Sequence, residues 1–94
     1  MKEQDRVKEI VRDLALEFKE AKFEYFFDDI FEIHYVRVTP QFFFDNNDQF
    51  SDRELEVYDL LSKEMKGIDF GFIGGNEDFE EYILIEGTEK ENKI

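Results

Sequence analysis

The 94-residue sequence contains no cysteine, which excludes disulfide bonds and thiolate metal sites. It also lacks any apolar run near the ~18–20 residues that a membrane-spanning helix needs. The amino-terminal stretch MKEQDRVKEI alternates charged and aliphatic residues and has none of the apolar core of a signal peptide. No Asn-x-Ser/Thr acceptor for glycosylation is present. We therefore expect a protein of the reducing cytoplasm.

Basic residues are scarce, with 12 Lys and Arg against 25 Asp and Glu and a net charge of −13. Residues 1–22 hold six of each sign, so the whole excess lies in residues 23–94. A nucleic acid would be repelled, because its phosphates require a basic surface. We expect no direct binding to nucleic acid. The same excess favours encounter with a positively charged protein surface.

Material for a packed core is plentiful, since 41% of the residues are hydrophobic and 12 are phenylalanine. The length suits one hydrophobic core. We expect a single α+β domain over residues 1–88 and a disordered carboxy-terminal tail at 89–94.

Two segments carry the pattern of helices. In the first, apolar residues recur at i, i+3, i+4, i+7, i+8 and i+11, a stripe that faces a core. The stripe consists of Val7, Ile10, Val11, Leu14, Ala15 and Phe18. The second helix is predicted to begin at Ser51, which forms a capping box with Glu54, while Phe50 packs on Leu55 as a hydrophobic staple. Gly67 suits the left-handed position after its end.

Four segments carry the pattern of strands, at residues 22–27, 31–38, 68–73 and 82–87. The pair Asp28-Asp29 marks a turn between the first two, and Pro40 ends the second. The order αββαββ predicts a two-layer α+β sandwich, in which an antiparallel sheet of four strands carries both helices on one face. Each pair of strands would form a hairpin. A fifth strand at 41–44 is left open.

The stretch QFFFDNNDQF at 41–50 superficially matches a calcium-binding EF-hand loop that starts at Asp45. The sixth position of such a loop must be glycine, and here it is Phe50. We interpret the stretch as a connector with residues 45–48 at its exposed tip, where weak divalent binding stays open. His34, the only histidine, has no cysteine or serine partner in a catalytic pattern. We expect no enzyme activity, no metal and no cofactor.

Acidic residues at the expected turns are interleaved with aromatic residues, as in FEYFFDD and EDFEEY. Aromatic rings give affinity at protein interfaces, and carboxylates give rate and specificity. We predict that these side chains bind a basic partner. The predicted contacts are Asp28, Asp29, Asp45, Asp48, Glu77, Asp78, Glu80 and Glu81, with Tyr25 and Tyr82 as aromatic candidates.

The resulting hypothesis is a small acidic protein that neutralises a basic partner protein, such as a nuclease toxin. In class this is an immunity protein, an antitoxin or a nucleic-acid mimic, although no family motif is recognised. The alternative is a homo-oligomeric structural or regulatory domain whose edge strands pair two copies, a homodimer in the simplest case. A small enzyme or ligand-binding protein would require an enclosed pocket with a perturbed carboxylate beside His34.

Overall fold

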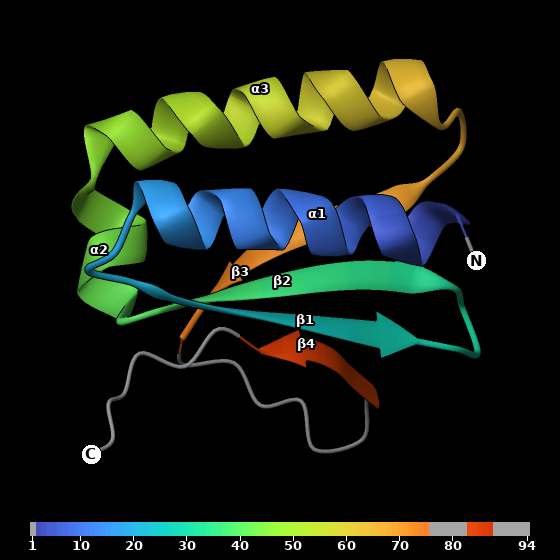
Figure 1. The fold of residues 1–94 in the computed structure, drawn as a ribbon, viewed down its shortest axis with the longest axis horizontal. Helices are drawn as coiled ribbons and strands as arrows, with labels where there is room; N and C mark the ends of the chain where they lie inside the picture. The colour runs from blue at the N-terminus through green and yellow to red at the C-terminus, as the bar shows by residue number, and fades with distance from the viewer. Residues whose placement is uncertain (1, 76–82, 88–94) are drawn as a thin grey trace.

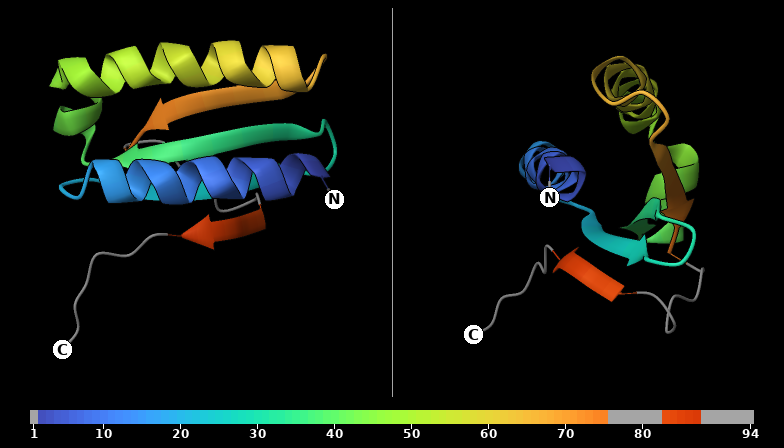
Figure 2. Two further views of the ribbon diagram at one scale, coloured as in Figure 1. Left: turned by 45° about the horizontal axis from the view of Figure 1, so that its top comes forward. Right: turned by 90° about the vertical axis from the view of Figure 1, so that its right-hand side faces the viewer.

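The computed structural model describes residues 2–75 and 83–87 of the chain. The elements follow in the order α1 (Lys2–Glu17), β1 (Lys22–Asp28), β2 (Ile33–Thr39), α2 (Gln41–Asn46), α3 (Asp48–Glu64), β3 (Asp69–Gly74) and β4 (Ile83–Gly87). The long helices α1 and α3 lie side by side and run in opposite directions over one face of the sheet (Figures 1 and 2). The short helix α2 lies at one end of the sheet (Figure 1).

The sheet is mixed, so the predicted antiparallel sheet is wrong. Its four strands follow the order β3-β2-β1-β4. β1 is antiparallel to β2 and to β4, whereas β2 and β3 are parallel. The predicted second hairpin is also wrong, because β3 and β4 occupy opposite edges. The reason is the 17-residue helix α3, which carries the chain back along the sheet so that β3 starts at the same end as β2.

Residues 41–44 belong to helix α2, so the fifth strand left open by the sequence is not formed. The predicted start of the second helix is likewise wrong. α3 begins at Asp48, and the Oδ1 atom of its N-cap residue Asn47 accepts a hydrogen bond from the backbone N–H of Phe50 at 2.8 Å. Ser51 therefore lies inside the helix. Asn47 is the better cap because this start places Phe50 in the first turn, facing the core.

Phe50 is fully buried at the centre of an aromatic cluster between the sheet and the helices. The centroid of its ring lies 5.6 Å from that of Phe18 and 5.4 Å from that of Phe72, and both pairs are edge-on. The centroid of the Phe43 ring lies 5.5 Å away. These are favourable geometries for aromatic pairs. The cluster ties α1, α2, α3 and β3 together. No helix in the described part of the chain is both long and apolar enough to cross a membrane.

Candidate binding surface at the β1–β2 turn

The β1–β2 turn, Asp29–Glu32, lies at the end of the sheet opposite to α2 (Figure 1). Asp28 is buried and fixes its geometry. The Oδ1 atom of Asp28 accepts hydrogen bonds from the backbone N–H groups of Ile30 at 3.0 Å and Phe31 at 3.2 Å. An aspartate that bonds the main chain two and three residues ahead is a common way to hold a tight turn. The turn is therefore an ordered element with defined side-chain positions.

The two residues at its tip are large, apolar and exposed. Ile30 is 80% exposed and Phe31 is 70% exposed, and Asp29 and Glu32 on either side are exposed too. Among the described residues, Leu16, Phe42 and Leu55 are the other exposed large apolar side chains, but none of them adjoins another in sequence. Two neighbouring apolar side chains between two carboxylates make this turn the most distinctive surface feature of the described chain.

Glu32 adds backbone strain to the same turn. Its φ angle of 57° lies in the left-handed region, which costs an L residue roughly 1–2 kcal/mol. Glycine would adopt this conformation at less cost. Strained residues gather at functional sites more often than elsewhere. Stability alone does not explain a turn that keeps two apolar side chains in water and a carboxylate in a strained position.

A buried polar network lies behind the turn. His34 and Tyr25 are both fully buried. The Tyr25 hydroxyl and the His34 Nδ1 atom are 2.5 Å apart, and His34 Nε2 lies 3.3 Å from Glu3 Oε1 on α1. The arrangement fits a neutral imidazole whose Nε2–H donates to Glu3 and whose Nδ1 accepts from Tyr25. The network thus connects α1 to both strands of the hairpin.

Burial dominates the acid–base properties of this network. It lowers the pKa of His34, and the carboxylates of Glu3, Asp69 and Glu32 oppose that shift without reversing it. Burial also raises the pKa of Tyr25, with a further contribution from Glu3. The neutral forms of both rings are therefore favoured. Neither ring is exposed, so in this structure the network lies wholly in the interior behind the turn.

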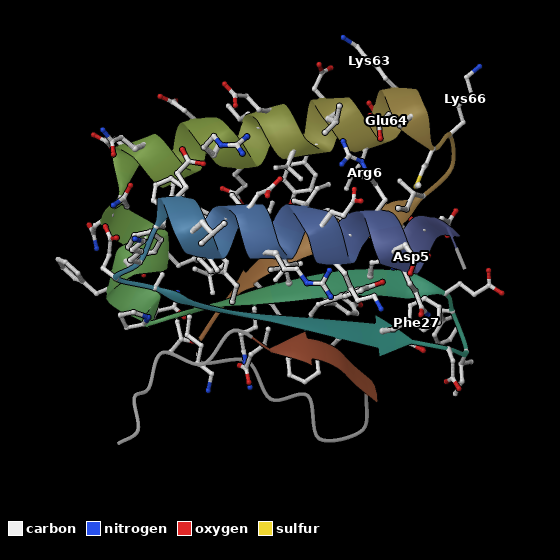
Figure 3. The ribbon with its side chains drawn as sticks, in the orientation of Figure 1. Asp5, Arg6, Phe27, Lys63, Glu64 and Lys66 are labelled. Carbon is white, nitrogen blue, oxygen red and sulfur yellow. The ribbon has the colours of Figure 1, made fainter. Side chains whose placement is uncertain are left out.

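Basic side chains of the helix layer include Arg6, Lys63 and Lys66. Arg6 on α1 contacts Glu64 on α3, with its Nε atom 2.8 Å from Oε1. Lys63 and Lys66 project from the end of α3, on the outer side of the helices, whereas Phe27 lies on the sheet below them (Figure 3). The β1–β2 turn itself contains no basic residue. The charged residues of the turn are therefore all acidic, and Glu3 on α1 and Asp69 on β3 add carboxylates near His34 behind it.

The structure separates the residues that the sequence predicted as one binding surface. Asp29 is exposed at the turn, whereas Asp28 and Tyr25 are buried in the hairpin. Asp45 and Asp48 are exposed on α2 and α3 at the opposite end of the sheet. The remaining predicted contacts lie outside the described residues; they are Glu77, Asp78, Glu80, Glu81 and Tyr82.

Sequence reasoning missed Ile30 and Phe31, the side chains that distinguish the turn. The signal was present in DDIFE, where an aspartate pair precedes two large apolar residues. Strand propensity predicts Phe31 in the second strand. In the structure the turn continues to Glu32, because the side chain of Asp28 accepts hydrogen bonds from the amides of Ile30 and Phe31. Strand β2 therefore begins only at Ile33.

Within the described ranges 2–75 and 83–87, no group of three or more His, Cys, Asp or Glu side chains is placed to hold a metal ion. Residues from Asp48 onward are helical, so the segment that superficially matches an EF-hand does not form a calcium loop. Comparison with models of protein families, with curated proteins and with solved structures finds no match. The function must therefore be inferred from the site itself.

Proposed function

We propose that this chain is a small acidic binding protein that attaches through its β1–β2 turn to a basic surface of another protein and blocks that surface. The observation that carries the proposal is the exposure of Ile30 and Phe31 between two exposed carboxylates on an ordered turn. Apolar anchors framed by charge are the usual composition of a protein-binding hot spot and its rim.

The energetics of the turn support a binding role. Full burial of an isoleucine or phenylalanine side chain contributes about 1.5–3 kcal/mol, so the two together supply a substantial part of a binding free energy. The hydrogen bonds that Asp28 accepts from the backbone hold the turn before any partner arrives, which lowers the entropy cost of ordering it. The carboxylates of Asp29 and Glu32 steer a basic partner toward the turn and disfavour an acidic one.

The partner's chemistry follows from the charge of this chain. A net charge of −13 favours a strongly basic partner. Proteins that bind nucleic acid present such surfaces to phosphates. We therefore extend the proposal to the class of immunity proteins, antitoxins and nucleic-acid mimics, which would neutralise a basic enzyme such as a nuclease by covering its substrate surface.

A second candidate function is self-association. β3 pairs with β2 and occupies an edge of the sheet, and an edge strand is a template for pairing with a second copy. Sedimentation equilibrium over a wide range of protein concentration separates the two proposals. A mass that stays at 11.4 kDa removes self-association, whereas a dimer that persists in the Ile30→Ser/Phe31→Ser variant supports it.

The proposal is tested by capture of the partner with three immobilised proteins. These are the wild type, the turn variant Ile30→Ser/Phe31→Ser and the control Leu16→Ser/Leu55→Ser. The control removes apolar side chains that are 71% and 68% exposed, on the two long helices. Substitutions at such exposed positions leave stability within about 0.5 kcal/mol, and circular dichroism verifies the fold of each variant.

We expect the wild type and the control to retain one basic protein from an extract of the native host, identified by mass spectrometry. The turn variant should lose it. Retention should also fall between about 0.05 M and 0.5 M salt, because screening weakens exposed charge interactions. Equal retention by all three proteins would show that the turn is not the binding surface, and retention that salt does not change would contradict recognition of the partner by its charge.

A further inference from the structure

A small pocket is lined mainly by residues of α2 and its neighbours. Helix α2 lies at the end of the sheet away from the β1–β2 turn (Figure 1). The pocket has a volume of about 300 Å³. It is formed where the turn after α1 meets α2 and the start of α3. The lining residues are Glu20, Pro40, Phe42, Phe43, Asn46 and Asn47. This volume is at the lower end of the range for small-molecule sites, and it suits one side chain better than a cofactor.

The walls of the pocket are held in place by the fold. Phe43 is buried, and its ring packs 5.7 Å from that of Phe18. The side chain of Asn47 caps α3 by accepting from the backbone N–H of Phe50. The Nδ2 group of Asn46 donates to the carbonyl oxygen of Phe42 at 3.0 Å, so the Oδ1 atom of Asn46 is presented as an acceptor. The ring of Phe42 is 76% exposed and offers a flat apolar surface.

The pocket is electrostatically suited to a cation. Among the described residues that line it, Glu20 is the only charged one. Glu20 lies just beyond α1, which ends at Glu17, and the carboxyl end of a helix favours positive charge. Residues 38–52 contain no Lys or Arg but include Asp45, Asp48 and Asp52, whereas Lys19 and Lys22 lie beside Glu20 in the sequence. An anionic ligand would meet the carboxylate of Glu20, so a cation is favoured over a phosphate.

We propose that this pocket binds an arginine side chain presented by a partner protein. The guanidinium group is planar, stacks on aromatic rings and forms paired hydrogen bonds with carboxylates. The ring of Phe42 supplies the stacking surface, Glu20 the carboxylate, and Asn46 an additional acceptor. This inference does not depend on the β1–β2 turn, which lies at the other end of the sheet.

The test is a titration followed by amide chemical shifts, with Nα-acetyl-arginine amide as the probe. Nα-acetyl-citrulline amide is the matched neutral probe, because citrulline has nearly the shape of arginine without its charge. We expect saturable shifts confined to the amides of Glu20, Phe42 and Asn46 and their neighbours. The arginine probe should bind about tenfold more tightly than the citrulline probe, as a charge-assisted hydrogen bond implies.

Two exposed substitutions identify the contributions of charge and stacking. Glu20→Gln should remove the preference for arginine over citrulline, and Phe42→Ala should weaken both probes. Ile30→Ser at the β1–β2 turn should change neither. The inference is wrong if both probes bind equally to the wild type, if the shifts spread over the surface without saturation, or if Glu20→Gln keeps the arginine preference. Equal binding of Nα-acetyl-lysine amide would also overturn the assignment to a guanidinium group.

Discussion

Tyr25→Phe removes one hydroxyl group from the interior and leaves the Nδ1 atom of His34 without its hydrogen-bond donor. Both side chains are fully buried, so water cannot replace the lost partner without opening the hairpin. An unsatisfied buried polar group costs about 1–3 kcal/mol of stability. We therefore expect the free energy of unfolding at pH 8 to fall by about 1–3 kcal/mol.

Urea denaturation followed by far-ultraviolet circular dichroism measures this loss. For a small domain the slope of unfolding free energy with urea is roughly 1–3 kcal/mol per molar, so the midpoint should move by about 1 M. A cycle with His34→Gln and the double variant isolates the coupling between the two side chains. Additive losses, or an unchanged midpoint in Tyr25→Phe, would refute the assignment of a stabilising contact.

The same network predicts how stability depends on pH. Burial lowers the pKa of folded His34 below its ordinary value of 6.5, so below that pH the unfolded chain binds more protons. The stability that neutral His34 contributes is thus complete above about pH 6.5, and it is lost as the pH falls toward the pKa of His34 in the folded chain. Glu54 changes stability with pH in the opposite direction, because burial raises its pKa. Its effect falls in a lower pH range than that of His34, nearer its ordinary pKa of 4.5.

Wild-type stability should therefore decline between about pH 7.5 and pH 5.5, and His34→Gln should flatten that decline. The carboxylates of Glu3, Glu32 and Asp69 face the imidazole in both the neutral and the charged state, and they limit the size of the effect. A wild-type profile that is level or rises toward low pH, or a slope that survives in His34→Gln, would contradict the assignment of a neutral buried histidine.

Three further substitutions test the local structure by their urea midpoints. Asn47→Ala should cost about 1 kcal/mol by removing the N-cap of α3, whereas Ser51→Ala should cost less than about 0.5 kcal/mol; the reverse order would restore the cap predicted from the sequence. Glu32→Gly should raise stability by about 0.5–1 kcal/mol by relieving the left-handed strain, and a loss would show that its side chain stabilises the turn. Phe50→Ala should cost about 3–5 kcal/mol, and a loss below about 1 kcal/mol would contradict its central place in the core.

Local patterns in the sequence were sufficient for part of the fold. The apolar stripe of α1 predicted its buried face, including Val7, Leu14 and Phe18. The first hairpin was also predicted, because strand-forming residues surround a clear turn signal. In β2, Val36 packs in the core and its neighbour Tyr35 is only partly buried, as the alternation of a strand requires. These features depend only on neighbours along the chain.

Local sequence patterns could not predict which distant segments of the chain pair with one another. Whether β3 pairs with β2 or with β4 depends on where α3 returns the chain, and the spacing of apolar residues does not report this. The aromatic run in α2 suited a strand as well as a helix. Its conformation is decided by the packing of Phe43 against Phe18 and Phe50. The sequence pattern predicted the cap at Ser51, whereas the structure caps α3 at Asn47, a start that places Phe50 in the core.

The candidate site was anticipated only in its charge. Asp29 was predicted as an exposed contact, and it is exposed at the turn. The contact between Glu3 and His34 joins residues 31 positions apart, which no local spacing predicts. The exposure of Ile30 and Phe31 could not be predicted either, because large apolar residues are expected to be buried. Such residues become informative only when a structure places them in water.

Amide hydrogen exchange, measured for the chain alone and in complex with the captured basic protein, tests the binding role of the β1–β2 turn most directly. The account predicts that the partner slows exchange in residues 28–33. Unchanged exchange in these residues, with protection confined to other surfaces, would contradict it.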